Sequence, residues 1–329
     1  MSPPPVLASV WRGPICEARI RGHVAVVDAG GDLLTALGDP GVLTTLRSTV
    51  KPIQALPFVR RAVDELGAGS AEIAIACASH NGEPRHVEVV RRLLGTAGVD
   101  EDALACGPQP PMDPETGRQL SLAGLQPQRV HNNCSGKHAA MLATCAVAGW
   151  PQQGYQHPGH PCQQAVAAEL GEALGIDIAR APQAVDGCSL PTYGAPLAAL
   201  ARAFATGTSD PAFRRCQDAM ASHPFLVAGT GRSDTALLAS AGSRVTTKVG
   251  AAGVWAAAVR PDGPGVAIKL EAGGGDSVPA IAIAVLIRLG ALPAELPAGL
   301  AAFAHPALHN WAGETVGETR VEEPEIARL

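Results

Sequence analysis

The order of apolar and polar residues follows a strand pattern at both ends of the chain and a helical pattern between them. Near the start, residues 24–28 and 33–37 are short apolar runs on either side of Gly30-Gly31, a dipeptide typical of hairpin turns. Strand patterns return towards the other end. Three such segments, each ended by glycine or proline, are expected at 243–249, 254–259 and 265–271.

The helical pattern begins after the first strands and fills the middle of the chain. Residues 48–66 are expected to be helical, with Pro52 tolerated in the first turn and Pro57 kinking the helix. Further helices with apolar faces are expected at 71–78, 84–94, 135–148, 161–174, 194–205 and 211–221, and after the last strands at 278–289. The tail after residue 296 is weakly patterned.

This order of elements predicts an α+β fold. One antiparallel sheet would be built from both chain ends and packed with helices, beside a mostly helical middle lobe. We expect a single domain over residues 1–329, with a sheet lobe at roughly 1–70 and 225–329 and a helical lobe at roughly 71–224. A cleft between sheet and helices is the expected place for a site.

Composition narrows the class of protein. Hydrophobic residues make up 47% of the chain and charged residues 17%, which is typical of a globular protein. The net charge of -5, without a basic stripe, argues against a nucleic-acid partner. The longest apolar stretch, 278–287, is too short to span a bilayer, so we expect no membrane association.

The cysteines and the N-terminal residues bear on location. Eight cysteines are scattered at long spacings without a CxxC pair, which suggests reduced thiols in a cytoplasm. The start, MSPPPVLASVWRG, has neither the basic region nor the apolar region of a signal peptide. We therefore expect a cytoplasmic protein.

Lysine is scarce. The chain has four lysines, Lys51, Lys137, Lys248 and Lys269, against twenty-one arginines. A lysine amine can lose its proton and act as a base or a metal ligand, whereas a guanidinium stays protonated. Codon bias is the alternative explanation, but three of the four lie in motifs with chemical meaning.

Three motifs supply hydroxyl groups or amines with possible chemical roles. Ser48 and Lys51 form S-x-x-K, whose members face the same side of a helix, so a neutral lysine can accept the serine proton. Ser79-His80-Asn81 follows an apolar run, and Lys248-Val249-Gly250 ends a strand. Taken singly, these could be a helix cap, a turn and an edge-strand lysine. Their order, S-x-x-K, S-x-N and K-x-G, is that of penicillin-recognising serine enzymes.

A fourth motif contains thiols. Cys134 and Lys137 lie three residues apart in HNNCSGKH, and Cys188 follows later in DGCSLPTY. Two thiolates and a nitrogen donor can hold Zn²⁺ and leave one position for water. The alternative is that both cysteines are buried and inert.

Together these segments resemble the asparaginase II family, the rhizobial-type L-asparaginases. The matching stretches are RSTVKPIQALP, ACASHNGEPRHVE, HNNCSGKHAAML, DGCSLPTYGAPL, FLVAGTGRSDT and TTKVGAAGVWAA followed by GVAIKL. The resemblance runs from about residue 5 to about residue 290. It implies a fold similar to serine β-lactamases and glutaminases, a homodimer, and hydrolysis of L-asparagine to L-aspartate and ammonia.

The resemblance also implies roles for particular residues. It pairs Ser48 with Lys51 and Ser79 with Lys248 as two catalytic tandems. It implies a supporting zinc site of Cys134, Lys137 and Cys188. Candidates to hold the substrate are Arg47, His80, Asn81, Asn133, Gly229, Thr230 and Arg232.

Three departures from the family pattern bear on the substrate preference and affinity of the site. Val249 stands where the family often has threonine, and Ala252 where it often has glutamate. The segment 271–276, EAGGGD, replaces the usual Asp-Asp-Gly. Two other functions stay open at this point: a β-lactamase or penicillin-binding-like acyl hydrolase, and a catalytically decayed asparagine-binding homologue. The sequence does not fix which serine attacks, the preference for asparagine over glutamine, or the metal.

Overall fold

The computed structural model describes residues 3–273 and 277–329, and the chain forms two compact units. The first, here called the sheet unit, comprises Met1–Thr49, Gly194–Thr208 and Ser240–Leu329. The second, the helical unit, comprises Val50–Tyr193 and Ser209–Ala239. Each unit is described by itself.

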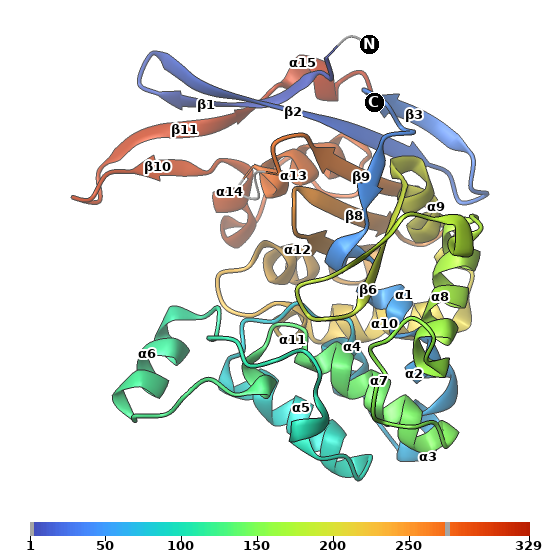
Figure 1. Ribbon diagram of the computed structural model, residues 1–329. Helices are drawn as coiled ribbons and strands as arrows, with labels where there is room; N and C mark the ends of the chain where they lie inside the picture. The colour runs from blue at the N-terminus through green and yellow to red at the C-terminus, as the bar shows by residue number, and fades with distance from the viewer. Residues whose placement is uncertain (1–2, 274–276) are drawn as a thin grey trace. The chain divides into compact units, whose positions relative to one another are not determined.

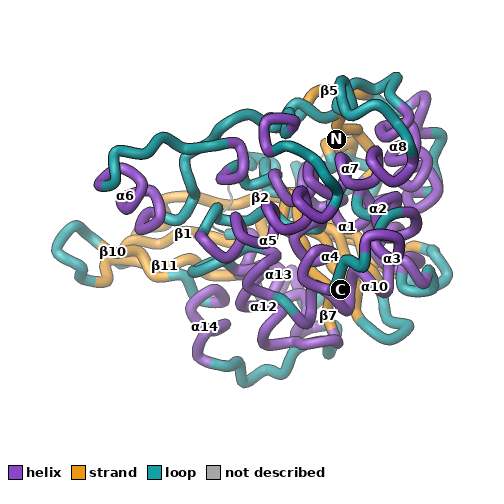
Figure 2. Tube along the Cα trace, turned by 90° about the horizontal axis from the view of Figure 1, so that it is seen from below, coloured by secondary structure: helices purple, strands orange, loops and turns teal. Residues whose placement is uncertain are grey.

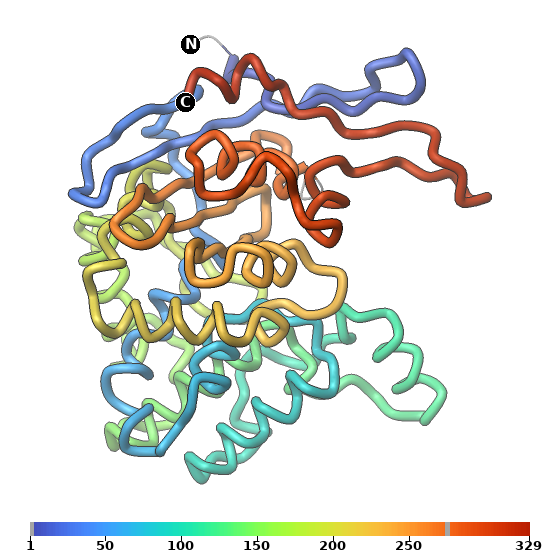
Figure 3. The backbone as a smooth tube through the Cα atoms, turned by 180° about the vertical axis from the view of Figure 1, so that it is seen from behind, coloured from blue at the N-terminus to red at the C-terminus, as the bar shows by residue number. Residues whose placement is uncertain are grey.

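The sheet unit contains one antiparallel sheet drawn from both ends of the chain (Figure 1). Its strand order is β10-β11-β1-β2-β9-β8-β7, and β3 pairs with β2. The strands are β1 (Val6–Arg12), β2 (Ile15–Val27), β3 (Leu33–Leu37), β7 (Val245–Gly250), β8 (Val254–Val259), β9 (Gly265–Leu270), β10 (Ala307–His309) and β11 (Thr315–Val321). The blue N-terminal and red C-terminal strands lie side by side in Figure 3 as well, where β1 pairs with β11. This confirms the predicted sheet from both chain ends.

Strand β8 of this sheet is apolar along its whole length. β8 reads VWAAAV, and its residues Val254 to Ala258 are almost completely buried. A strand without alternation needs cover on both faces. Two helices, α9 (Leu197–Gly207) and α13 (Val278–Arg288), pack against both β8 and β9. The remaining helices of this unit are η5 (Gly242–Arg244), α14 (Ala298–Ala304) and α15 (Glu323–Ile326).

The helical unit is built around α7 (Ser135–Ala148), whose first eleven residues are all buried. Helices α2, α4, α5 and α8 pack against it. The helices here are α1 (Lys51–Gln54), α2 (Leu56–Arg61), α3 (Val63–Leu66), α4 (Ser70–Ala76), α5 (Pro84–Thr96), η2 (Glu101–Ala103), α6 (Pro114–Leu122), η3 (Arg129–His131), α8 (Pro161–Leu174), η4 (Ile178–Arg180), α10 (Pro211–Ser222) and α11 (Pro224–Val227). Long loops flank α6 on both sides (Figure 2).

A few elements span the boundary between the two units along the chain. They are η1 (Arg47–Val50), β6 (Pro191–Pro196) and α12 (Ser233–Ala241). β6 pairs with β5 (Gln183–Val185) through its first half and with β4 (Leu43–Thr45) through its second half. No helix in residues 3–273 and 277–329 is long and apolar enough to cross a membrane.

Most predicted elements are present. The helices predicted at 135–148 and 161–174 and the strand at 254–259 have the expected bounds. The helix expected over 48–66 is broken into three short helices, α1, α2 and α3. Pro57, which cannot donate a backbone hydrogen bond, lies in the first turn of α2, directly after the first break. The structure starts the helix expected at 194–205 only at Leu197, because residues 194–196 belong to β6. The first strand and the C-terminal strands, which have short and irregular patterns, were not predicted.

Candidate active site

Two helix ends meet in the helical unit, and their loops carry most of the predicted site residues. α4 ends at Ala76, and α7 begins at Ser135. A Cβ atom on Gly136 would overlap the carbonyl group of Ile75, so glycine is required for α7 to pack this closely on α4. This contact places the Ser-His-Asn motif, which follows α4, beside the HNNCSGKH segment at the start of α7.

Backbone hydrogen bonds fix the loop 79–81 between two other segments. Ser79 N donates to Val227 O at 3.0 Å, and His80 N donates to Asn133 O at 3.1 Å. Three segments that are far apart in sequence are therefore joined at this loop.

The His80 ring is part of this framework. Its Nδ1 accepts from the Gly82 N–H at 3.1 Å, and its Nε2 lies 3.0 Å from Ser135 Oγ. The Ser135 hydroxyl donates to Val130 O, so Nε2 carries the proton. Burial is the largest cause that lowers the pKa of His80 well below its usual value. With both ring nitrogens engaged, the geometry favours a role for His80 in holding the loop over contact with substrate.

The Lys51 amine lies among the groups that these segments bring together. It is completely buried, and Nζ donates to Ala78 O at 2.6 Å. The same nitrogen lies 2.9 Å from Ser79 Oγ and 3.2 Å from Cys134 Sγ. A neutral amine has two N–H groups and one lone pair, so it can donate to the carbonyl and the sulfur while accepting the Ser79 proton. Burial lowers the pKa of Lys51, although the charge of Cys134 acts in the opposite direction.

Two thiols and a second amine surround Lys51, and we call Lys51, Cys134, Lys137 and Cys188 the thiol–amine cluster. Lys137 Nζ donates to Cys188 Sγ at 3.3 Å. A hydrogen bond between the two thiols lowers the pKa of Cys188 and raises the pKa of Cys134. Burial opposes the charge on Lys137, but interactions with Cys188, Cys134 and Asp186 outweigh it and raise the pKa of this amine.

The donor set of this cluster fits a soft divalent metal. Two sulfurs and one amine nitrogen meet in one buried place, and thiolates favour Zn²⁺ over hard cations. Because the pKa of Lys137 is raised, its amine must lose a proton before it can bind a metal. Within the described residues, no three or more His, Cys, Asp or Glu side chains form a metal-binding group. A metal site here would therefore depend on the lysine.

A second polar group of residues begins at Asn81 of the same loop, and we call Asn81, Glu83, Thr230 and Arg232 the carboxylate network. One Glu83 oxygen accepts from Asn81 Nδ2 at 3.1 Å and from Thr230 N at 2.8 Å. The other accepts from Thr230 Oγ1 at 2.8 Å. Arg232 Nη1 donates to Asn81 Oδ1 at 2.8 Å. The network thus joins three of the predicted substrate-binding residues.

The sheet unit holds the other predicted residues. Arg47 has a left-handed backbone with φ of 49°, an uncommon conformation for a residue with a side chain, and η1 starts there. A Cβ on Gly250 would lie 3.0 Å from Thr49 Cγ2. The glycine of the K-x-G motif therefore lets the 47–49 turn, which contains Ser48, pack against the end of β7, the strand that carries Lys248.

The contacts that the structure shows differ from those that the motifs suggested. Lys51 is hydrogen-bonded to Ser79, a contact that no motif predicted because the two residues are distant in sequence. The pairings of Ser48 with Lys51 and of Ser79 with Lys248 stay predictions. Glu83 was not predicted either, although it directly follows the polar loop. Of the segment that replaces Asp-Asp-Gly, residues 274–276 lie outside the described residues.

Comparisons with known proteins identify the family. A search of curated protein sequences finds no significant match. Among solved structures, a β-lactamase from Mycobacterium bovis is similar, with 16% sequence identity and a TM-score of 0.43, over 82% of this chain and 94% of that chain. The model of the family described as L-asparaginase II matches residues 8–321, almost the whole chain, which confirms the resemblance seen in the motifs. The chain therefore belongs to the L-asparaginase II family and is a hydrolase that acts on a small molecule.

Proposed function

We propose that the protein hydrolyses the side-chain amide of L-asparagine to L-aspartate and ammonia. The observation that carries the proposal is the completely buried Lys51 amine, 2.9 Å from the Ser79 hydroxyl, in a chain of this family. Burial lowers the pKa of this amine, so it loses its proton more readily than an exposed lysine and is better suited to accept one from serine. We also expect a cytoplasmic homodimer, as the sequence suggested.

The reaction would proceed through a serine ester. A serine Oγ attacks the amide carbon while a neutral lysine accepts the hydroxyl proton. That proton then passes to the departing nitrogen, so that ammonia leaves and an aspartyl ester remains. Water attacks the ester with the same base, and L-aspartate is released with the serine restored.

Ser48 is our first candidate for the nucleophile, because it occupies the S-x-x-K position. Three residues of chain keep its Cα within roughly 10 Å of that of Lys51. The Lys51–Ser79 hydrogen bond makes Ser79 the second candidate. In the first case, Ser79 and Lys248 relay protons to the leaving ammonia. In the second, Ser79 attacks directly.

Substrate recognition would use Arg232 of the carboxylate network. Arg232 has hydrogen bonds from Nη1 only, to Asn81 and to the Met112 sulfur. Its Nε and Nη2 have no hydrogen-bond partner in the part of the chain that the structure describes. A guanidinium with two nitrogens available can bind the α-carboxylate of the substrate in bidentate fashion. Arg47, Asn133 and Gly229 remain further candidates.

Cys134, Lys137 and Cys188 would hold a zinc ion, which we expect to support the reaction without being obligatory for it. When bound, the ion would help to orient the substrate; in the alternative it would polarise the amide directly. The residues themselves order the two loops around residues 132–138 and 186–188. Zinc remains part of the proposal.

Ammonia release from L-asparagine and L-glutamine tests the proposal. The variants are Ser48→Ala, Ser79→Ala and Lys51→Ala beside the wild type, with mass spectrometry of the protein quenched during turnover. We expect turnover of L-asparagine by the wild type, strong losses in all three variants, and an added aspartyl group on one serine.

The outcome also separates the alternatives. Equal activity in the wild type and all three variants would remove Ser-Lys catalysis from the proposal. Binding of L-asparagine without ammonia release by the wild type would indicate a binding protein. Acylation by a labelled β-lactam without asparagine turnover would indicate a penicillin-recognising hydrolase.

A further inference from the structure

The Glu83 carboxylate is almost completely buried, and the mechanism above does not use it. It faces no Lys or Arg ion pair among the described residues. Instead, three donors from Asn81 and Thr230 hold its two oxygens. A buried carboxylate is costly unless such hydrogen bonds compensate it. Because the buried Glu83 carboxylate belongs to the same network as Arg232, the candidate substrate-binding arginine, we expect it to have a role in substrate binding.

Glu83 fixes the orientation of the Asn81 amide. Asn81 Nδ2 uses both protons, one towards Glu83 Oε1 at 3.1 Å and one towards Thr230 O at 2.9 Å. The carbonyl Oδ1 is therefore turned towards Arg232 Nη1, 2.8 Å away. The opposite orientation would set Oδ1 against two acceptors and the amide N–H groups against a guanidinium. The carboxylate thus decides which atom Arg232 meets.

Glu83 also anchors the turn that leads to Arg232. Thr230 donates to it through both its backbone N–H and its hydroxyl. Gly229 has φ of 117°, and a Cβ there would overlap Glu83 Oε1 and lie 2.8 Å from Asn81 Nδ2. The turn is therefore packed directly on the carboxylate, and Arg232 is held from two directions, through Asn81 and through the turn.

We propose that Glu83 is a positioning residue for substrate recognition: it holds Arg232, through Asn81 and the Thr230 turn, in the orientation that binds the α-carboxylate of an amino-acid substrate. The inference rests on the proposed function for the identity of that substrate. Glu83 itself does not touch the substrate. Its loss acts on affinity and leaves the chemical step at the thiol–amine cluster intact.

Kinetics of Glu83→Ala and Glu83→Gln with two ligands test this role. L-asparagine has the α-carboxylate, and 3-aminopropanamide is the same molecule without it. We expect Glu83→Ala to raise KM for L-asparagine about tenfold or more, the loss expected for about 1.4 kcal/mol of binding. We expect kcat to change less than about threefold. The constant for inhibition of L-asparagine turnover by 3-aminopropanamide should also change less than about threefold, which is well below the effect of losing one charged hydrogen bond.

Glu83→Gln distinguishes position from charge. A glutamine oxygen can still accept from Asn81 and from Thr230 N, and its amide can donate to Thr230 Oγ1. A positioning role predicts that glutamine restores most of the affinity that alanine loses. If Glu83→Gln binds L-asparagine as weakly as Glu83→Ala does, the positioning role is wrong. It is also wrong if both variants keep the wild-type KM. An equal weakening of both ligands by alanine would also overturn it.

Glu72→Ala is the matched control. Glu72 is a nearly buried carboxylate of the same unit, bonded to Gly69 N at 3.0 Å and Arg92 Nε at 2.6 Å. Its removal should lower Tm and leave KM unchanged. If Glu83→Ala does not fold, Glu83→Gln and Thr230→Val carry the test.

Calorimetric binding of L-aspartate separates this inference from the proposed function, because it needs no turnover. If the wild type binds L-aspartate but releases no ammonia, the proposed function fails, and weaker binding by Glu83→Ala still supports the positioning role. If the wild type turns over L-asparagine and Glu83→Ala binds L-aspartate normally, only the positioning role fails.

Discussion

The thiol–amine cluster and the carboxylate network lie at opposite ends of one short segment, since Ser79 contacts the first and Asn81 and Glu83 belong to the second. In the cluster, amines and thiols compete for protons, so the pKa values of Lys51 and Cys188 are lowered while those of Lys137 and Cys134 are raised. In the network, the donors of Asn81 and Thr230 and Arg232 Nη1 each meet a matching acceptor.

This difference indicates different tasks. Groups whose protons are easily moved are suited to acid–base chemistry and metal binding. Groups whose hydrogen bonds are complementary hold one geometry and are suited to positioning a ligand. Variants in the cluster should therefore act on kcat, and variants in the network should act on KM.

The largest effect is expected from Lys51→Met. Loss of a general base typically costs 10²- to 10⁴-fold in rate, so kcat for ammonia release should fall by about that factor. Lys51→Arg should not restore it, because a guanidinium keeps its proton. A Lys51→Arg enzyme with wild-type kcat would show that proton transfer at this position is not needed.

Cys188→Ser should remove the zinc that we propose. Loss of an outer-shell partner alone weakens metal binding 10- to 100-fold, so loss of a ligand should weaken it by more than about 100-fold. Atomic emission of the purified protein measures the metal, with Cys16→Ser on β2 as the control. We expect turnover that is reduced but measurable. Complete loss of turnover, with substrate binding and Tm retained, would instead assign zinc a direct part in the chemistry.

Gly229→Ala should act through the network. The new Cβ would meet the Glu83 and Asn81 side chains at a φ of 117°, so we expect a cost of about 1–3 kcal/mol in the free energy of unfolding. KM for L-asparagine should rise and kcat should change little.

Gly67→Ala is the control for backbone strain alone. Gly67 has φ of 60° with no atom within 4 Å of its added Cβ. The Gly67→Ala substitution should lower the free energy of unfolding by about 1 kcal/mol and leave KM unchanged. A fall in kcat for Gly229→Ala at constant KM would contradict the division of tasks between the two regions.

Glu72→Gln tests stability against pH outside both regions. Burial opposes the charge of Glu72, but hydrogen bonds from Arg92 and from the Glu72 and Gly69 backbone outweigh it, so its pKa is lowered from 4.5. The ionised form therefore stabilises the fold above the unfolded pKa, and this contribution is lost as pH falls through the lower folded pKa.

We expect a difference of about 1 kcal/mol between wild type and Glu72→Gln at pH 7, small because Arg92 is half-exposed and solvent screens the pair. Urea unfolding at several pH values measures it. The difference should shrink below about pH 4.5. A difference that stays constant with pH would assign the effect to packing.

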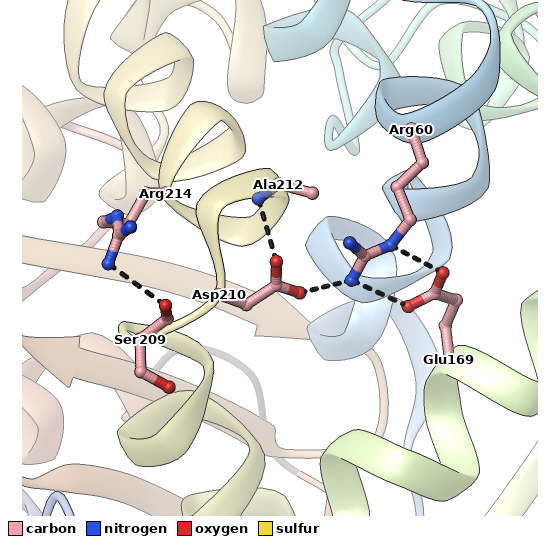
Figure 4. Close-up of polar contacts among 6 residues, drawn as sticks. All are labelled: Arg60, Glu169, Ser209, Asp210, Ala212 and Arg214. Atoms are coloured by element: carbon pink, nitrogen blue, oxygen red, sulfur yellow. Dashed lines mark hydrogen bonds and ion pairs between the residues drawn. The ribbon is translucent and has the colours of Figure 1, made fainter.

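The smallest effect is expected from Arg60→Ala. Arg60 joins α2 to Glu169 of α8 at 2.8 Å and to Asp210, the N-cap residue of α10, at 2.5 Å (Figure 4). The arginine is 40% exposed, and exposed ion pairs contribute less than about 1 kcal/mol each. Thermal unfolding should show a small loss, and kcat and KM should stay unchanged. A change in either would connect this surface contact to the site.

Regular apolar periodicity made the fold predictable. The helix at 135–148 and the strand at 254–259 are long or strongly apolar segments, and local pattern decides such elements. Strand β11 gains its stability from pairing with β1 at the other end of the chain, and β10 from pairing with β11. No local signal encodes the pairing with β1.

The sequence by itself determined the family and which reactive groups are available: the S-x-x-K motif of Ser48 and Lys51, the motifs that contain Ser79 and Lys248, and the thiols. Only the tertiary structure decided that Lys51 contacts Ser79 and that Glu83 accepts a hydrogen bond from Thr230 in the turn that leads to Arg232. Helical and strand periodicity relates residues a few positions apart. Contacts between residues 28 or 147 positions apart depend on how helices and loops pack, as Gly136 permits for α4 and α7.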